Sequence, residues 1–359
     1  MIDPVSFLAF TLVWVGLSHA VCAYRALNRL IWACLPGAVL LLAVHPLALL
    51  FALTSFAFSF GLYCVGRAGS SHLRARLPYL VLLLLFVPDL TGIWAAHPIL
   101  WLGSAFFVIR QMMTVAAGLK ERRRPSDFVP SLLLATFFFA ALPSGPVFNG
   151  LRVWDALHAE SKPSYADGLY RLFEGFAYLF ALAGLASVAI EQADAAGAAL
   201  AAEGETAARW MLRILIDPLL GFAFVFTTFY GYSRMAEGTA LLFGFEVPQN
   251  FNRPHLATDL ADFWKRWHRS MADFVMQHIY LPLLVSTKRA RLALITAFVF
   301  MGMWHQFTLG FLIWGLGHGL CLAVLLPWAH RRRIPAAAIR VASLAYVVAL
   351  SAIAQGVWT

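Results

Sequence analysis

Residues 298–320 read "FVFMGMWHQFTLGFLIWGLGHGL", an apolar run that His305 and Gln306 interrupt. The run belongs to a longer apolar segment near residues 290–328, and an α-helix needs about 20 apolar residues to cross a bilayer core. An ionisable side chain at that depth normally faces a cavity or a partner, because its charged form costs about 2.5 kcal/mol or more. The stretch therefore predicts membrane-embedded helix with a polar group directed into the protein.

The rest of the chain has the same character. Of the 359 residues 61% are hydrophobic and 13% are charged, and the mean hydropathy is +0.74, whereas about a quarter of the residues in soluble domains are charged. No charge-rich linker divides the chain. We expect one all-α integral membrane domain over residues 1–359, with about nine to eleven transmembrane or re-entrant helices. Its apolar segments lie near residues 5–24, 30–66 (two short helices), 77–95, 97–118, 128–148, 168–190, 210–245, 272–286, 290–328 and 335–357.

The net charge of +9 comes from short basic clusters between these segments. Such clusters are typical of cytoplasmic loops under the positive-inside rule. A nucleic-acid site is not expected, because no extended basic face with interleaved aromatic residues is present. A basic cytoplasmic surface would instead attract anionic lipid or an acidic carrier protein. The clusters are Arg25 and Arg29, Arg74 and Arg76, Arg122–Arg124, Lys265–Arg269, Lys288–Arg291 and Arg331–Arg333.

The four cysteines do not predict a metal site. They show no C-x-x-C spacing and mostly lie in apolar runs, so we interpret them as small core residues. They are Cys22, Cys34, Cys64 and Cys321.

The end of the segment at residues 128–150 contains Pro143, Gly145 and Pro146 within four residues. These residues stop a helix and leave backbone groups that lipid cannot satisfy. One interpretation is a loop at the membrane surface, and the other is a re-entrant turn that lines a polar cavity.

A second unusual stretch is "NFNRPHLATDLADFWKRWHRSM", residues 250–271. Pro254 disfavours a continuous helix before it, and Thr258 or Asp259 could cap a new helix that contains "DLADFWKRWHRS". Its apolar side and its cations suit the membrane interface. Taken alone, His268 on such a helix would be a surface histidine.

His305 lies in a far less polar setting than His268. A neutral imidazole there avoids most of the cost of burial and is a base near neutral pH, although a purely structural hydrogen bond explains the spacing equally well. His318 follows 13 residues later, roughly 19 Å along a straight helix at about 1.5 Å per residue. The two cannot act on one bond unless the helix breaks, and we interpret His318 as a packing residue.

Other catalytic motifs are missing from the sequence. It contains no G-x-S-x-G, P-loop or H-E-x-x-H pattern, which leaves serine hydrolase, nucleotide and zincin chemistry without support. Histidine, asparagine and hydroxyl groups remain, and these suit acyl transfer with a buried base.

The residues resemble those of the membrane-bound O-acyltransferase (MBOAT) family. The resemblance covers roughly residues 100–320 and rests on "FYGYSRMAEGTALLFGFEVPQNFNRPHLATDLADFWKRWHRSM", "IYLPL", "GMWHQFTLGFLIWGLGHG", "ALPSGPVFNG" and "GSAFFVIRQM". It is specific to a bacterial branch that O-acetylates alginate-like polysaccharides or transfers D-alanine to teichoic acids. It implies a ring of helices around a central tunnel in the bacterial cytoplasmic (inner) membrane.

The resemblance also implies roles for individual residues. His305 matches the catalytic histidine of the family, and His268 matches the second histidine of the site. The resemblance implies substrate-binding positions at Asn250, Asn252, Arg253, Trp267, Trp304, Gln306 and Ser144.

From this match we expect His305 to accept the proton of an acceptor hydroxyl, or to relay it, while His268 orients or polarises the reacting groups. An acyl-histidine intermediate is a less economical alternative. No cofactor is expected to be bound. The acyl donor would be a co-substrate such as acetyl-CoA or an acyl-carrier thioester on the cytoplasmic side, and the acceptor an envelope or exported polysaccharide, reached directly or through a separate extracytoplasmic transferase.

Some positions depart from the branch. Gln306 replaces a usual Gly, Met276 and Gln277 replace a usual Arg-Asp pair, and Thr228 replaces a frequent Asp. These changes affect the expected acceptor and carrier contacts more than the histidines. D-alanyl or other acyl transfer, and a non-catalytic scaffold or transporter, stay open as alternatives.

Overall fold

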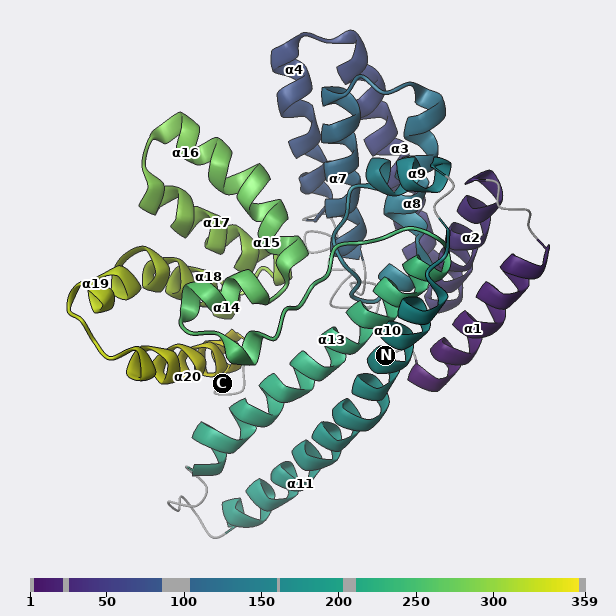
Figure 1. Cartoon of the computed structure of the whole chain (residues 1–359). Helices are drawn as coiled ribbons and strands as arrows, with labels where there is room; N and C mark the ends of the chain where they lie inside the picture. Colours follow the sequence, from purple (N-terminus) through teal and green to yellow (C-terminus); the bar gives the residue numbers. More distant parts are fainter. Residues whose placement is uncertain (1–2, 22–25, 86–103, 160–161, 203–210, 355–359) are drawn as a thin grey trace. The chain divides into compact units, whose positions relative to one another are not determined.

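The computed structural model describes residues 3–21, 26–85, 104–159, 162–202 and 211–354 (Figure 1). Within these ranges every regular element is a helix, which confirms the all-α prediction.

Six helical stretches of the described residues are long and apolar enough to cross a membrane. They confirm a polytopic membrane protein, while the predicted central tunnel stays a prediction. The six are residues Ala26–Val44, Pro46–Ala68, Tyr165–Leu200, Ile214–Leu242, Leu309–Arg331 and Ala336–Ala354, and two shorter apolar helices lie at Pro4–Ala20 and Ala290–His305. The predicted segments at 77–95 and 97–118 include residues 86–103, which lie outside the described ranges, as do Cys22 and Arg25.

The chain forms two compact units, Met1–Phe176 with Gly231–Gln249, and Ala177–Tyr230 with Asn250–Thr359. Each unit is described by itself, and the single domain expected from the sequence stays a prediction.

In the first unit α2, α3, α7 and α8 pack against one another (Figure 1). The apolar segment at residues 30–66 forms two helices, as predicted, because the His45 side chain accepts a hydrogen bond from the Leu47 N–H and Pro46 occupies the first helical position of α3. The helices of this unit are α1 (Pro4–Val21), α2 (Ala26–Val44), α3 (Pro46–Ala68), α4 (Ser71–Arg76), a 3₁₀ helix (Leu77–Leu85), α7 (Ser104–Lys120), α8 (Pro125–Phe137), a 3₁₀ turn (Phe139–Ala141), α9 (Gly150–His158), most of α10 (Tyr165–Ala177) and the end of α13 (Asp217–Leu242).

The Pro143–Pro146 turn of this unit follows a buried stretch. The residues that lead into the turn, Phe137–Leu142, are covered by protein. Arg110 on α7 donates from its Nη1 to Ala141 O in this stretch over 3.0 Å, and from its Nε to Ala135 O, two residues before the stretch, over 2.9 Å. The turn is thus covered by protein, and the re-entrant interpretation stays a prediction.

The second unit contains the C-terminal helices and the stretch at residues 250–271. Its helices are a π-helical turn (Tyr178–Leu182), α11 (Ala183–Ala202), a π-helical turn (Leu212–Ile216), the start of α13, a 3₁₀ turn (Pro254–Leu256), α14 (Leu260–Arg266), α15 (Arg269–Val275), a π-helical turn (Met276–Tyr280), α16 (Leu281–Thr287), α17 (Ala290–His305), α18 (Leu309–Leu320), a π-helical turn (Cys321–Leu325), α19 (Leu326–Arg331) and α20 (Ala336–Ala354).

Helices α17 and α18 form a tight antiparallel hairpin, and α20 packs on α18 (Figure 1). Glycines make the close approach feasible: a Cβ atom at Gly302 would lie 2.3 Å from Phe311 O, and one at Gly315 would lie 2.6 Å from Phe298 O. Small residues at membrane helix contacts allow this kind of backbone proximity.

One expectation about local structure is wrong. Asp259 does cap a helix, since its Oδ1 accepts from the Asp262 N–H over 2.8 Å, and Asp262 pairs with Arg266 at 2.9 Å. The helix ends at Arg266, however, and a second one begins at Arg269. Trp267 is extended and His268 has φ 45°. The expected single helix through "DLADFWKRWHRS" is therefore two short helices joined at His268.

Candidate functional site

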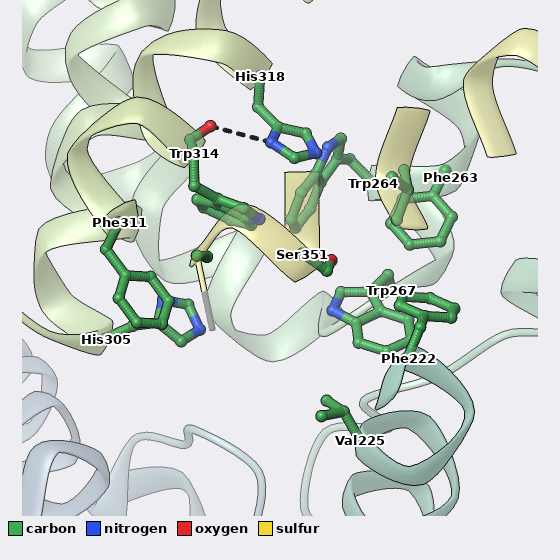
Figure 2. Close-up of a pocket in the computed structure, with 12 residues that line it drawn as sticks. Phe222, Val225, Phe263, Trp264, Trp267, His305, Phe311, Trp314, His318 and Ser351 are labelled. Carbon is green, nitrogen blue, oxygen red and sulfur yellow. Dashed lines mark hydrogen bonds between the residues drawn. The ribbon is translucent and has the colours of Figure 1, made fainter. Parts of the chain in front are cut away.

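A pocket of about 300 Å³ lies in the second unit (Figure 2). Aromatic and aliphatic side chains form most of its wall, and the polar contributors are two histidines, one serine and the indole N–H groups of the tryptophans. None of its described lining residues is Asp, Glu, Lys or Arg. The lining residues are Phe222, Val225, Phe263, Trp264, Trp267, His305, Phe311, Trp314, His318, Val347, Ser351 and Ala354.

His305 is the last residue of α17 and lines this pocket. Its ring stacks on Phe311 at 5.4 Å and nearly parallel, and its Nδ1 lies 2.6 Å from Met301 O. A carbonyl oxygen only accepts hydrogen bonds, so Nδ1 must carry the hydrogen. In the neutral ring Nε2 is then the unprotonated nitrogen, which is the arrangement that a general base needs.

His318 lines the same pocket from α18. Its Nδ1 donates to Trp314 O over 3.0 Å, as the dashed line in Figure 2 shows, so its Nε2 is also the unprotonated nitrogen. The Trp314 ring lies between the two histidines, with its centroid 5.6 Å from that of His305 and 4.5 Å from that of His318. The pocket thus holds two imidazoles in the same tautomer.

The break between α17 and α18 explains why both histidines reach one pocket. Gln306 is extended with φ −169°, and Thr308 caps α18 by accepting from the Phe311 N–H. The separation of roughly 19 Å expected along a straight helix does not apply, because the chain reverses between residues 305 and 309. The helix is therefore broken between His305 and His318, which is what the two residues need in order to reach one site.

His268 is buried but is not among the residues that line the pocket. Its ring packs edge-on against that of Phe229, with ring centroids 4.6 Å apart, and its centroid lies 6.0 Å from that of the Trp304 ring. Trp304 in turn contacts His305, with ring centroids 4.5 Å apart. His268 is therefore linked to His305 through the Trp304 ring.

The backbone around His268 is held by Asn250. Asn250 is fully buried; its Oδ1 accepts from the Ser270 hydroxyl over 2.5 Å, and its backbone oxygen accepts from the Arg269 N–H over 2.9 Å. These two bonds fix the residues that directly follow His268 and thereby help to hold it in the left-handed region, which non-glycine residues seldom adopt. In this structure the Asn250 amide supports His268 and does not face the pocket.

The environment of His268 also affects its titration. Burial lowers the pKa of His268 well below its ordinary value, and the charge that His305 would carry lowers it further. His268 is thus neutral near pH 7.

The other predicted substrate-binding residues occupy varied places. Trp267 lines the pocket, stacked on Phe263 at 5.4 Å. Trp304 is buried but is not among the residues that line the pocket, and Asn252, Arg253 and Gln306 are exposed. Ser144 belongs to the first unit, where its buried Oγ has no partner among the described residues. The structure thus groups His305 and Trp267 at the pocket, and Trp304 and His268 are connected to His305 by ring contacts.

Sequence reasoning missed most of the residues that line the pocket, including the polar contributors His318, Trp264 and Ser351. His318 was interpreted as a packing residue because its distance from His305 was measured along a continuous helix. Trp264 lies within the helix expected at the membrane interface, and Ser351 gave no signal within a uniformly apolar segment. The sequence did contain a usable signal for His318, since a Thr followed by helical residues just after His305 is typical of a helix start.

The site offers proton transfer in apolar surroundings. Each pocket histidine has a fixed tautomer with a lone pair at Nε2, and an aromatic wall with few polar groups is typical of ligand sites. Among the described residues, no three His, Cys, Asp or Glu side chains lie together in a group that could hold a metal ion.

The chain is similar to several named enzymes. It is 27% identical to the "Peptidoglycan O-acetyltransferase" of Helicobacter pylori over 69% of this chain and 52% of that protein. It is 27% identical to the "Probable alginate O-acetylase AlgI" of Azotobacter vinelandii over 64% and 45%. It is 25% identical to the "Teichoic acid D-alanyltransferase" of Bacillus subtilis over 60% and 55%. The chain spans about half the length of these curated relatives.

A family match agrees with these similarities. The family described as "MBOAT, membrane-bound O-acyltransferase family" matches residues 127–353, which is more than half of the chain and includes His268, His305 and every residue that lines the pocket except Ala354. The chain belongs to the membrane-bound O-acyltransferase family.

Proposed function

We propose that this protein is an O-acyltransferase that moves an acyl group, acetyl in the first instance, to a hydroxyl of an envelope or exported polysaccharide. The observation that carries the proposal is His305: its Nδ1 donates to Met301 O, and its Nε2 is therefore a free base in a pocket without charged side chains. Acyl transfer to oxygen needs such a base, and the family match and the named relatives support this reaction class.

The proposed reaction uses that geometry. His305 Nε2 takes the proton of the acceptor hydroxyl as its oxygen attacks the carbonyl carbon of the donor, a thioester such as acetyl-CoA or an acyl-carrier thioester. The new C–O bond forms, the C–S bond breaks, and the protonated Nε2 returns its proton to the leaving thiolate. The apolar wall excludes competing water, which favours transfer over hydrolysis.

Within this proposal His268 has a supporting role. Its ring touches Trp304, and Trp304 touches His305, so His268 holds the catalytic imidazole in place through this aromatic contact. It would also polarise the site as a neutral dipole. The donor side is proposed to face the cytoplasm of a bacterial inner membrane, with the polysaccharide acceptor reached directly or through a separate transferase.

D-alanyl transfer is a second candidate, and one observation favours it: the similarity to a teichoic acid D-alanyltransferase is about as high as the similarity to the acetylases. The two candidates share the histidine chemistry and differ in the transferred group, whose mass distinguishes them.

The test compares acyl groups on envelope and exported glycans by mass spectrometry. Cells carry the wild type, a deletion, His305→Ala, His268→Ala or the control His255→Ala, an exposed histidine in the same unit, at matched membrane levels. We expect the deletion to remove one acyl group and His305→Ala to lower it by about 10²- to 10⁴-fold. His268→Ala should reduce it less, and His255→Ala should leave it unchanged.

Two outcomes would contradict the proposal. Full acylation with His305→Ala, against loss in the deletion, would remove His305 as the base. An unchanged glycan in the deletion strain would favour a scaffold or transporter.

A further inference from the structure

The pocket has a second polar side, formed by His318 and Trp264. The exposed fractions of these residues are 1% and 9%, and His318 Nε2 and Trp264 Nε1 have no hydrogen-bond partner among the described residues. The two rings meet edge to face with centroids 5.2 Å apart, and both residues line the pocket (Figure 2). Buried polar atoms of native proteins are nearly always hydrogen-bonded, so two neighbouring exceptions indicate a ligand group.

The chemistry of the two nitrogens defines that group. His318 Nδ1 donates to Trp314 O, which leaves Nε2 as an acceptor. The indole Nε1–H of Trp264 is a donor only. The complementary group must both donate and accept a hydrogen bond. A hydroxyl does both, whereas an ammonium group cannot accept, and a carboxylate or an ester carbonyl cannot donate.

His305 adds a second acceptor in the same pocket. Since its Nε2 also carries a lone pair, the pocket presents one acceptor at each histidine, on opposite sides of Trp314, and the Trp264 indole donor lies beside His318. A ligand with one hydroxyl can satisfy one side alone, and a ligand with several hydroxyls can satisfy both. The aromatic side chains between them suit the apolar C–H surface of a polyhydroxylated ring.

We propose that His318 and Trp264 form a subsite that binds a non-reacting hydroxyl of the acceptor, while His305 takes the proton from the hydroxyl that is acylated. This inference rests on the proposed function, because it needs a reacting hydroxyl at His305. His318 is thus a positioning residue and determines acceptor specificity. A site that hydrogen-bonds a substrate hydroxyl discriminates strongly against analogues that lack it.

The first test measures binding without catalysis. The full chain is labelled with ¹⁵N-tryptophan in lipid nanodiscs, and the indole signal of Trp264 is assigned as the one missing in Trp264→Phe. Methyl β-D-glucopyranoside is titrated, with its fully O-methylated derivative as a probe that cannot donate. We expect a saturable shift of the Trp264 signal with the glucoside, none with the O-methylated probe, and loss of the shift in His318→Phe.

The second test uses acetyl transfer from p-nitrophenyl acetate to two acceptors, the glucoside and cyclohexanol, which has a single hydroxyl. Trp264→Phe and His318→Phe keep aromatic rings in the wall. Each should raise KM for the glucoside by about 3- to 10-fold, the effect of one lost hydrogen bond, with little change in kcat and no change with cyclohexanol. Trp328→Phe and His255→Phe, at exposed positions of the same unit, are the matched controls.

The outcomes separate this inference from the proposed function. If the glucoside does not shift Trp264, the subsite is overturned even where acetyl transfer proceeds. If Trp264→Phe and His318→Phe both alter the hydrolysis of p-nitrophenyl acetate in the absence of an acceptor and leave the KM for the glucoside unchanged, then Trp264 Nε1 and His318 Nε2 bind water. That result also overturns the inference. If the wild type transfers acetyl to neither acceptor but shows the shift lost in His318→Phe, the hydroxyl subsite stands and the proposed reaction fails.

Discussion

The hairpin of α17 and α18 and the bend between α14 and α15 both carry histidine among aromatic rings. In the hairpin the chain turns after His305, so the ring stays at the end of a helix and faces a pocket of about 300 Å³ that His318 shares. In the bend His268 is itself the turning residue, with φ 45°, and its ring is covered by Phe229 and Trp304. A histidine that precedes the turn, as His305 does, is thus available to a ligand, whereas a histidine at the turn itself, as His268 is, supports the structure.

The two regions also differ in what holds them. The hairpin depends on close backbone contact at glycines, and the bend depends on two hydrogen bonds that the buried Asn250 accepts from Arg269 and Ser270, the residues that follow His268. Packing of the hairpin leaves aromatic side chains that line the pocket, whereas hydrogen bonds hold the backbone of the bend. Each can be disturbed separately, and three predictions follow in order of expected effect.

Gly315→Leu should have the largest effect, and it tests the hairpin. Even a Cβ atom there would lie 2.6 Å from Phe298 O, so the helices must separate. We expect a loss near the upper end of the about 1–3 kcal/mol typical of overpacking, measured by SDS-induced unfolding in mixed micelles, and loss of acyl transfer as the pocket wall moves. Gly184→Leu is the control, since nothing lies within 4 Å of a Cβ at that helical position. Equal stability of the two variants would show that the close contact does not hold the hairpin.

Asn250→Ala tests the bend. It removes the acceptor of the Ser270 hydroxyl, and a lost buried hydrogen bond should destabilise by about 1–2 kcal/mol. Asn252→Ala, an exposed position two residues away, should change stability by less than about 0.5 kcal/mol. The same unfolding assay compares them, with Ser270→Ala and the double variant to measure coupling. Additive losses from Asn250→Ala and Ser270→Ala would argue against a shared bond.

The pH dependence of stability sharpens the difference between the two regions at His268. Its folded pKa is depressed, so the unfolded chain binds the proton more readily, and the stabilisation is complete above the unfolded pKa of about 6.5 and is lost as pH falls below it. The free energy of unfolding of the wild type should therefore fall between pH 7.5 and pH 5.5 through this group.

His268→Asn is the matched variant for this measurement, because Asn tolerates the left-handed backbone and does not titrate. The pH slope of the free energy of unfolding should be smaller in His268→Asn than in the wild type. Identical slopes would mean that His268 is not buried in the neutral form.

Particular residues show how far the sequence could be interpreted. The apolar runs predicted membrane helices, because about 20 apolar residues meet the length requirement of a bilayer, and the length of the segment at residues 30–66 predicted the two helices α2 and α3. The single helix expected through His268 failed, because Asn250 and Ser270, 20 residues apart, impose a conformation that local propensity disfavours. The role of His318 was missed for a related reason. Its distance from His305 depends on the turn at residues 306–308, which the apolar pattern of the sequence did not reveal.

The sequence alone determined the class of the protein and its family, since hydropathy and motif spacing are properties of the linear chain. It also marked His305, because an ionisable residue in an apolar run is costly unless it faces a cavity or a partner. Tertiary structure alone decided which side chains share the pocket. That grouping depends on where the chain reverses and on which backbones approach closely. Contacts such as Gly302 with Phe311 O and Asn250 with Ser270 set both, and neither follows from local sequence.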